Sequence, residues 1–244
     1  MNTKKIYFLV ILAGSVSAAS LTHAEASYSD AAISNNTQNP FTGFHATGAV
    51  GFGHISAKTK TTLSTPTGLT THMGNYRSTA NGISFSAAGD YVWECQEYLL
   101  GLELGGTYHT NKTRHDSAHR NTAGVTDLRE TVKYKYNLAS RAKVGKKINE
   151  SMAVFAGLGV SRGSFEYIAH SDGNKSKKKF DLWGITPSAS ICVKLSDKTL
   201  LSVRYTHTFY QSQKIANLPS GRSSINGKIK PQSSSVRIGL TYKF

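Results

Sequence analysis

The 244-residue sequence is poor in several features that define other classes of protein. Its two cysteines, Cys95 and Cys192, are too few for a disulfide scaffold, and whether they pair is left open. Beyond residue 26 no apolar run approaches the roughly 20 residues that a membrane-spanning helix requires. Helical spacing is not sustained anywhere in the chain. Acidic residues are also scarce, 14 against 29 Lys and Arg, and the resulting formal charge of +15 implies anionic partners.

The N-terminus has the features of a secretory signal peptide. Lys4 and Lys5 precede a short apolar stretch that ends in small residues, so cleavage is expected after residue 24, with a second acceptable position two residues later. A transmembrane anchor is the alternative, although the stretch is short for one. The predicted organisation is a signal peptide over residues 1–24, a flexible N-terminal segment over 25–42 and one folded domain over 43–244.

From residue 43 onward, apolar and polar residues alternate as they do in half-buried β-strands. In the fourth segment this places Val132, Tyr134 and Tyr136 on one face, with Lys133 and Lys135 on the other. Pro187 lies inside the sixth segment, where its missing amide predicts a local bulge. Eight segments are predicted, at 44–54, 82–92, 98–109, 128–145, 152–165, 180–194, 199–210 and 235–244.

The connections between these segments alternate strictly between short and long. The long ones are 56–81, 110–127, 166–179 and 211–232. An even number of antiparallel strands, with tight turns at one end and long loops at the other, is typical of bacterial outer-membrane barrels. The predicted fold class is all-β, a closed eight-stranded antiparallel transmembrane β-barrel with short periplasmic turns and four long external loops. A soluble sandwich or lipocalin-like barrel is the alternative, and it would not sort its loops by length.

Aromatic residues fall near both ends of the predicted apolar band, as expected at two membrane interfaces. The predicted periplasmic girdle contains Phe44, Tyr91, Trp93, Tyr98, Tyr242 and Phe244, and the outer girdle contains Phe52, Tyr108, Tyr134, Tyr136, Trp183, Tyr205 and Phe209. The last strand, which alternates and ends at Phe244, resembles the assembly signal of outer-membrane barrels. We therefore expect the barrel assembly machinery to recognise Phe244, the mature protein to be a monomer, and residues 25–42 to lie in the periplasm.

Charged residues are also predicted inside the barrel. An eight-stranded barrel is just wide enough for its side chains, and unpaired charges there would be costly. Glu103 is expected to pair with Arg141 or Arg204, and Asp90 with Lys143 or Lys194. A plugged, rigid lumen follows from these pairs. A gated ion path, as in a small-pore porin or channel, is the alternative.

Several short stretches carry a family resemblance. Tyr134–Ala139 with Ala156–Val160 is similar to the central hairpin of small outer-membrane barrels of the opacity-protein kind. Trp183–Pro187 followed by Leu201–Tyr205 is similar to their sixth and seventh strands, and the architecture resembles the barrel domain of OmpA. The resemblance implies an adhesin-like cell-surface protein located in the outer membrane of a Gram-negative bacterium.

The four long connections carry fourteen basic and four acidic residues, a charge that predicts polyanion binding. The implied partners are outer-membrane lipids and lipopolysaccharide, and the resemblance adds host glycans or receptors. The basic residues are Lys58, Lys60, Arg77, Lys112, Arg114, Arg120, Lys175, Lys177, Lys178, Lys179, Lys214, Arg222, Lys228 and Lys230.

No catalytic residue, metal site or cofactor is predicted. Arg204–His207 resembles the histidine motif of lipid A deacylase barrels, but Phe209 stands where those enzymes place a serine nucleophile. The histidines on the loop side have no spacing typical of a compact metal site. These are His54, His72, His109, His115, His119, His170 and His207. The predicted function is a structural or adhesin-like, non-enzymatic surface barrel, with a small-pore porin as the alternative.

Overall fold

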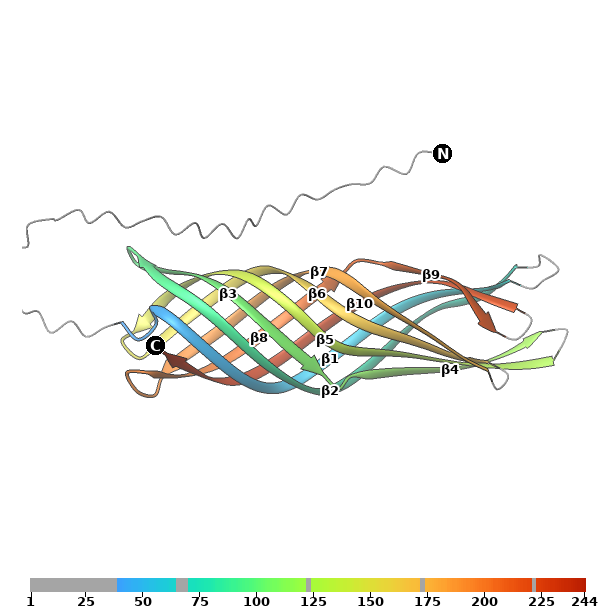
Figure 1. Ribbon diagram of the computed structural model, residues 1–244, viewed down its shortest axis with the longest axis horizontal. Helices are drawn as coiled ribbons and strands as arrows, with labels where there is room; N and C mark the ends of the chain where they lie inside the picture. The colour runs from blue at the N-terminus through green and yellow to red at the C-terminus, as the bar shows by residue number, and fades with distance from the viewer. Residues whose placement is uncertain (1–38, 65–69, 122–123, 172–173, 221–222) are drawn as a thin grey trace, which may run out of the picture. The chain divides into compact units, whose positions relative to one another are not determined.

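The computed structural model describes residues 39–64, 70–121, 124–171, 174–220 and 223–244, all within one compact unit (Figure 1). The predicted signal peptide and residues 25–38 of the predicted flexible segment lie outside these ranges. Within them no helix has the length and apolarity to cross a membrane. The strands are β1 (Gly43–Ser64), β2 (Thr70–Cys95), β3 (Tyr98–His109), β4 (Lys112–Asn121), β5 (Gly124–Asn149), β6 (Met152–Ser171), β7 (Asn174–Lys194), β8 (Thr199–Tyr210), β9 (Gln213–Ser220) and β10 (Ser223–Lys243).

Eight of these strands form a closed antiparallel ring, which confirms the predicted barrel. Their order is β1-β2-β3-β5-β6-β7-β8-β10, and β10 pairs with β1 from Lys243 to Ser224. Closure leaves the ring without an open edge, so its backbone amides and carbonyls pair within the sheet. The other two strands continue β3 and β8 after two-residue breaks: β4 pairs with β5, and β9 pairs with β10.

The long connections consist largely of paired strand and extend beyond the ring at the end opposite the C-terminus (Figure 1). In the first hairpin, β1 and β2 stay paired from Gly43 and Val92 to Ser64 and Thr70. The sequence predicts irregular loop there, because outside the membrane the outward face of each strand becomes polar and the apolar alternation weakens. The short turns are confirmed: they are formed by residues 96–97, 150–151 and 195–198. Both cysteines are free, Cys95 beside one of these turns and Cys192 on the lumen side.

A belt of exposed apolar side chains surrounds the ring. Phe52 is 75% exposed and Leu104 is 69% exposed, and large apolar residues on all eight ring strands share this outward orientation. A protein surrounded by water would rarely expose so large an apolar area, whereas acyl chains would cover it. Except for Tyr134, the residues of both predicted girdles are exposed as expected.

A β-bulge explains why the girdle prediction is wrong for Tyr134. The pairing of β5 with β6 shifts register between Tyr134 and Tyr136, so Lys135 is an additional residue and the faces of β5 exchange beyond it. Tyr134 is therefore buried in the interior, while Lys133 and Lys135 face outward. The prediction for this strand assumes unbroken alternation. Pro187, by contrast, produces no bulge, since β7 pairs with β8 in unchanged register on either side of it.

Two buried apolar clusters close the interior. The outer cap lies inside the hairpin extension and contains Ile55, Ala57, Val132, Tyr134, Phe165, Tyr167, Leu182, Tyr210, Ile215 and Ile229. The periplasmic cap contains Phe41, Val92, Leu99, Ala153, Phe155 and Leu200. Phe41 is 1% exposed, so residues 39–42 pack into the barrel end rather than belonging to the predicted flexible segment. Phe41, two residues before β1, thereby removes an aromatic side chain from water.

Candidate functional site: the charged lumen and the basic outer wall

A layer of buried ion pairs lies between the two caps. Glu103 accepts hydrogen bonds from Arg141 and from Arg204, the latter at 2.6 Å, so one carboxylate holds the two arginines named as its candidates. Asp90 accepts a hydrogen bond from Lys143. Lys194, the other candidate for Asp90, instead pairs with Asp197 at a turn. Directly opposite register positions bring these groups together, since Glu103 faces Asp90 on β2 and Arg141 on β5.

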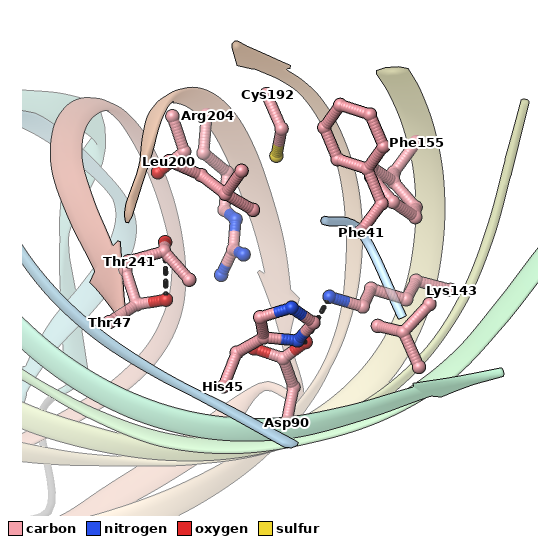
Figure 2. A pocket seen from close by; sticks show the side chains of 12 residues that line it. Phe41, His45, Thr47, Asp90, Lys143, Phe155, Cys192, Leu200, Arg204 and Thr241 are labelled. Carbon is pink, nitrogen blue, oxygen red and sulfur yellow. Dashed lines mark hydrogen bonds and ion pairs between the residues drawn. The ribbon is translucent and has the colours of Figure 1, made fainter. Parts of the chain in front are cut away.

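A small chamber separates this layer from the periplasmic cap. Figure 2 shows His45, Asp90 and Lys143 on one side of it, with Arg204 and the Cys192 thiol pointing in from the other. His45 Nδ1 lies 3.6 Å from Asp90 Oδ2, and its Nε2 lies 3.3 Å from the Pro40 carbonyl oxygen. The chamber leaves about 20 Å³ for the centres of water molecules. It therefore has room for one or two waters and not for an organic substrate.

A second chamber lies between the ion pairs and the outer cap. Hydroxyl groups line most of it, and Arg141 and Arg237 contribute the charged side chains. Arg237 is 5% exposed and donates to the Thr107 hydroxyl at 2.6 Å and to the Thr206 hydroxyl at 3.1 Å. The alternation of the last strand predicts that Arg237 faces inward, as it does, but the sequence assigns no partner to it.

On the outer wall, six basic side chains lie together on four neighbouring strands. Lys58 on β1 is directly opposite Arg77 on β2 and Lys230 on β10. Lys60 is opposite Lys228, which is in turn opposite Lys214 on β9. All six are exposed, and β1, β9 and β10 contain no Asp or Glu. We call this group the basic ridge; it consists of Lys58, Lys60, Arg77, Lys214, Lys228 and Lys230.

A second basic region on β5, β6 and β7 contains an acid. Glu166 lies opposite Lys133 and Lys179 and forms a 2.7 Å ion pair with Lys135. The hydrogen bond from Lys135 holds the pKa of Glu166 below its usual value. We call this region the mixed patch; it consists of Lys133, Lys135, Glu166, Lys175, Lys177 and Lys179. Lys178 is half-buried on the opposite face of β7, so the run of three lysines does not act as one cluster.

The remaining basic residues named from the sequence fall elsewhere. Lys112 is exposed at the start of β4. Arg114 and Arg120 belong to β4 by their backbone, but their side chains lie outside the described part, as does the whole of Arg222. Among the described residues no group of three or more His, Cys, Asp and Glu side chains could hold a metal ion.

No protein family matches the sequence, and no curated protein is detectably similar to it. Solved structures with the same fold include two outer membrane proteins. The outer membrane protease OmpT from Escherichia coli matches with a TM-score of 0.51 at 8% identity, over 82% of this chain and 97% of that chain. The outer membrane protein OprG from Pseudomonas aeruginosa matches with a TM-score of 0.50 at 15% identity, over 83% and 98%. The chain therefore has the fold of small β-barrels of the bacterial outer membrane, and a fold that includes a protease does not by itself exclude catalysis.

Proposed function

We propose that the protein is a non-catalytic, adhesin-like surface barrel whose basic ridge binds an anionic glycan. The observation that carries this proposal is the direct cross-strand pairing of like charges. Lys58 stands between Arg77 and Lys230, and Lys228 stands between Lys60 and Lys214. Like charges directly opposite each other destabilise a sheet, so an anion bound along these rows would offset an existing repulsion.

The spacing of the ridge suits a linear polyanion. Neighbouring strands are about 4.8 Å apart, and alternate residues on one face of a strand are about 6.8 Å apart. The six cations therefore form a grid rather than a pocket. Individual exposed ion pairs are weak, so affinity must come from several sulphate, phosphate or carboxylate groups that bind together.

The height of the ridge favours a glycan over the phosphates of the membrane lipid. Lys58 lies six residues beyond Phe52, the last apolar lipid-facing residue of β1. That separation is about 20 Å along the strand, or about 15 Å above the apolar band for a strand tilted by about 40°. The outward residues between them on β1 are His54 and Ser56, neither of which is acidic. Lipid phosphates at headgroup level would lie below the ridge.

The test is heparin retention of the refolded barrel in detergent free of lipopolysaccharide. The ridge variant carries Lys58→Gln, Lys60→Gln, Lys228→Gln and Lys230→Gln. A control with the same loss of charge carries Lys175→Gln, Lys177→Gln, Lys178→Gln and Lys179→Gln. We expect the ridge variant to lose retention about tenfold and the control several-fold less. Equal retention of the two variants, or retention that is insensitive to salt, would contradict the proposal, because screening over about 8 Å at physiological ionic strength must weaken charge binding.

The porin alternative receives less support from the interior. The outer cap and the periplasmic cap lie at opposite ends of the lumen, and Glu103 and its two arginines occupy the middle. A conducting path would need all three to move.

A further inference from the structure

The interior between the two caps holds more positive than negative charge. Its described carboxylates are Asp90 and Glu103. Its described cations are Arg141, Lys143, Arg204 and Arg237. Asp90 is engaged by Lys143, and Glu103 is shared by Arg141 and Arg204. Both carboxylates therefore already form ion pairs with cations other than Arg237.

Arg237 is the cation without an acid. Among the described residues it forms no ion pair with a carboxylate, and its two side-chain hydrogen bonds go to the neutral hydroxyls of Thr107 and Thr206. In the β8–β10 register it lies directly opposite Arg204. A buried charge without a counter-charge is strongly unfavourable, and a like charge opposite it adds to that cost.

The chamber beside Arg237 is built to receive a negative charge. It is lined by the hydroxyls of Thr107, Thr186, Thr206, Thr208, Ser233 and Ser235, together with both arginines. Hydroxyls can rotate to donate, and a guanidinium can only donate. Arg141 is 6% exposed, and its Nε–H has no acceptor among the described residues. Two potential acceptors that line the same chamber, Asn137 Oδ1 and His109 Nδ1, also lack a partner among the described residues. The occupant therefore meets groups of both kinds, and the uncompensated charge of Arg237 is what favours an anion over a water molecule.

We propose that this chamber binds one monatomic anion, a chloride ion, between Arg237 and Arg141. The space left for the centres of water molecules is about 10 Å³, which is enough for one water-sized atom or molecule. Phosphate, sulphate and carboxylate ligands are too large for it. A water molecule would fill the same space, but it would leave the charge of Arg237 uncompensated. The ion is enclosed, with the outer cap on one side and the Glu103 ion pairs on the other, and it is taken up as the barrel closes.

The ion is a structural counter-ion, and this inference is independent of the basic ridge. It gives Arg237 an anionic partner and lowers the excess positive charge between the two caps from two to one. Its removal should therefore weaken the barrel itself and leave glycan binding at the outer wall unchanged.

The first experiment locates the ion in the intact protein. The barrel is refolded and crystallised in sodium bromide, and anomalous scattering is measured at the bromine edge. A peak between Arg237 and Arg141 is the expected result. An ordered water there, with no anomalous signal, would overturn the proposal.

The second experiment measures the energetic linkage. The thermal midpoint of the heat-dependent gel shift is followed as chloride replaces gluconate at constant ionic strength. Above the dissociation constant, each tenfold rise in chloride should raise the midpoint by about 3 °C. Arg237→Gln should remove this dependence, and Thr206→Val provides a milder variant that should weaken it. Lys58→Gln, which lies on the outer wall, is the control and should keep the full dependence. A midpoint of the wild-type protein that is equal in chloride and gluconate, or a dependence that persists in Arg237→Gln, would overturn the assignment.

Discussion

The lumen and the outer wall of this barrel use the same basic residue types under opposite constraints. Inside, Glu103 holds Arg141 and Arg204, and Asp90 holds Lys143. Outside, the six cations of the basic ridge lie side by side on strands that bring no acid to them. Burial makes an unmatched charge expensive, whereas water and salt allow an excess to persist. Charge in the lumen therefore serves the fold, and charge on the wall is available to a ligand.

The largest expected effect comes from removing an acid inside the barrel. Glu103→Gln leaves Arg141 and Arg204 buried without their shared carboxylate, and breaking a buried pair costs about 3–5 kcal/mol. The barrel should lose its compact, unboiled gel band at a markedly lower temperature or urea concentration than the wild type. Glu166→Gln, which removes an acid from the outer wall, should lower the free energy of unfolding by at most about 1 kcal/mol, because its partner Lys135 stays in contact with water. Equal losses of stability in the two variants would contradict the view that an acid in the lumen contributes more to stability than an acid on the outer wall.

The second prediction compares heparin retention with thermal stability in one variant of the outer wall and one variant of the lumen. The fourfold ridge variant should lose heparin retention about tenfold but keep the thermal midpoint, since exposed charges contribute little to stability. Because the substitutions also relieve the cross-strand repulsion, any small change in the midpoint should be a rise. Arg204→Gln, in the lumen, should lower the thermal midpoint but keep full retention on heparin. A lumen variant that folds but loses glycan binding would show that the interior shapes the binding surface.

A smaller effect is expected at the mixed patch. Because Lys135 lowers the pKa of Glu166, the stabilisation from this pair is present above the unfolded carboxylate pKa and is lost as the pH falls through the lowered folded value. Neighbouring side chains cover Glu166, but Lys135 is 39% exposed and its charge is screened by water, so the loss should be at most about 1 kcal/mol. Glu166→Gln should raise heparin retention up to about twofold by freeing Lys135. Retention that falls in this variant would argue against a charge-driven interaction.

The smallest expected effect is on conductance. In planar bilayers the pure barrel should show no steady channel, because apolar caps close the lumen on both sides of the ion pairs. Glu103→Ala and Arg141→Ala should leave conductance absent, since neither substitution removes a cap. Steady channels that respond to these substitutions would instead support the porin alternative.

The ring and its ion pairs could be predicted because they follow from short-range rules. Period-two alternation specifies which face of each strand meets lipid, and the alternation of short and long connections specifies an even, closed meander. Given that topology, inward Glu103 and inward Arg141 must lie on adjacent strands. The positions of the charged layer in the lumen follow with little further information.

The strand extensions outside the membrane, the bulge in β5 and the burial of Phe41 could not be predicted from the sequence. Where the strands leave the membrane, polar outward residues such as Lys58 and Lys60 remove the apolar signal, although both remain in β1. The bulge at Lys135 reverses the faces of β5 without any local signature such as glycine. Phe41 precedes the first strand and has no periodicity of its own, so only the finished barrel shows where it is buried.

The sequence by itself determined the barrel, its orientation, its exposed apolar band and the excess of positive charge, because alternation and composition are properties of the chain. The tertiary structure decided which charges meet. Register placed Lys58 between Arg77 and Lys230, gave Glu103 two arginines, and left Arg237 among hydroxyls. Cross-strand neighbours depend on pairing between residues far apart in the chain, and a shift of one residue would have exchanged every one of them.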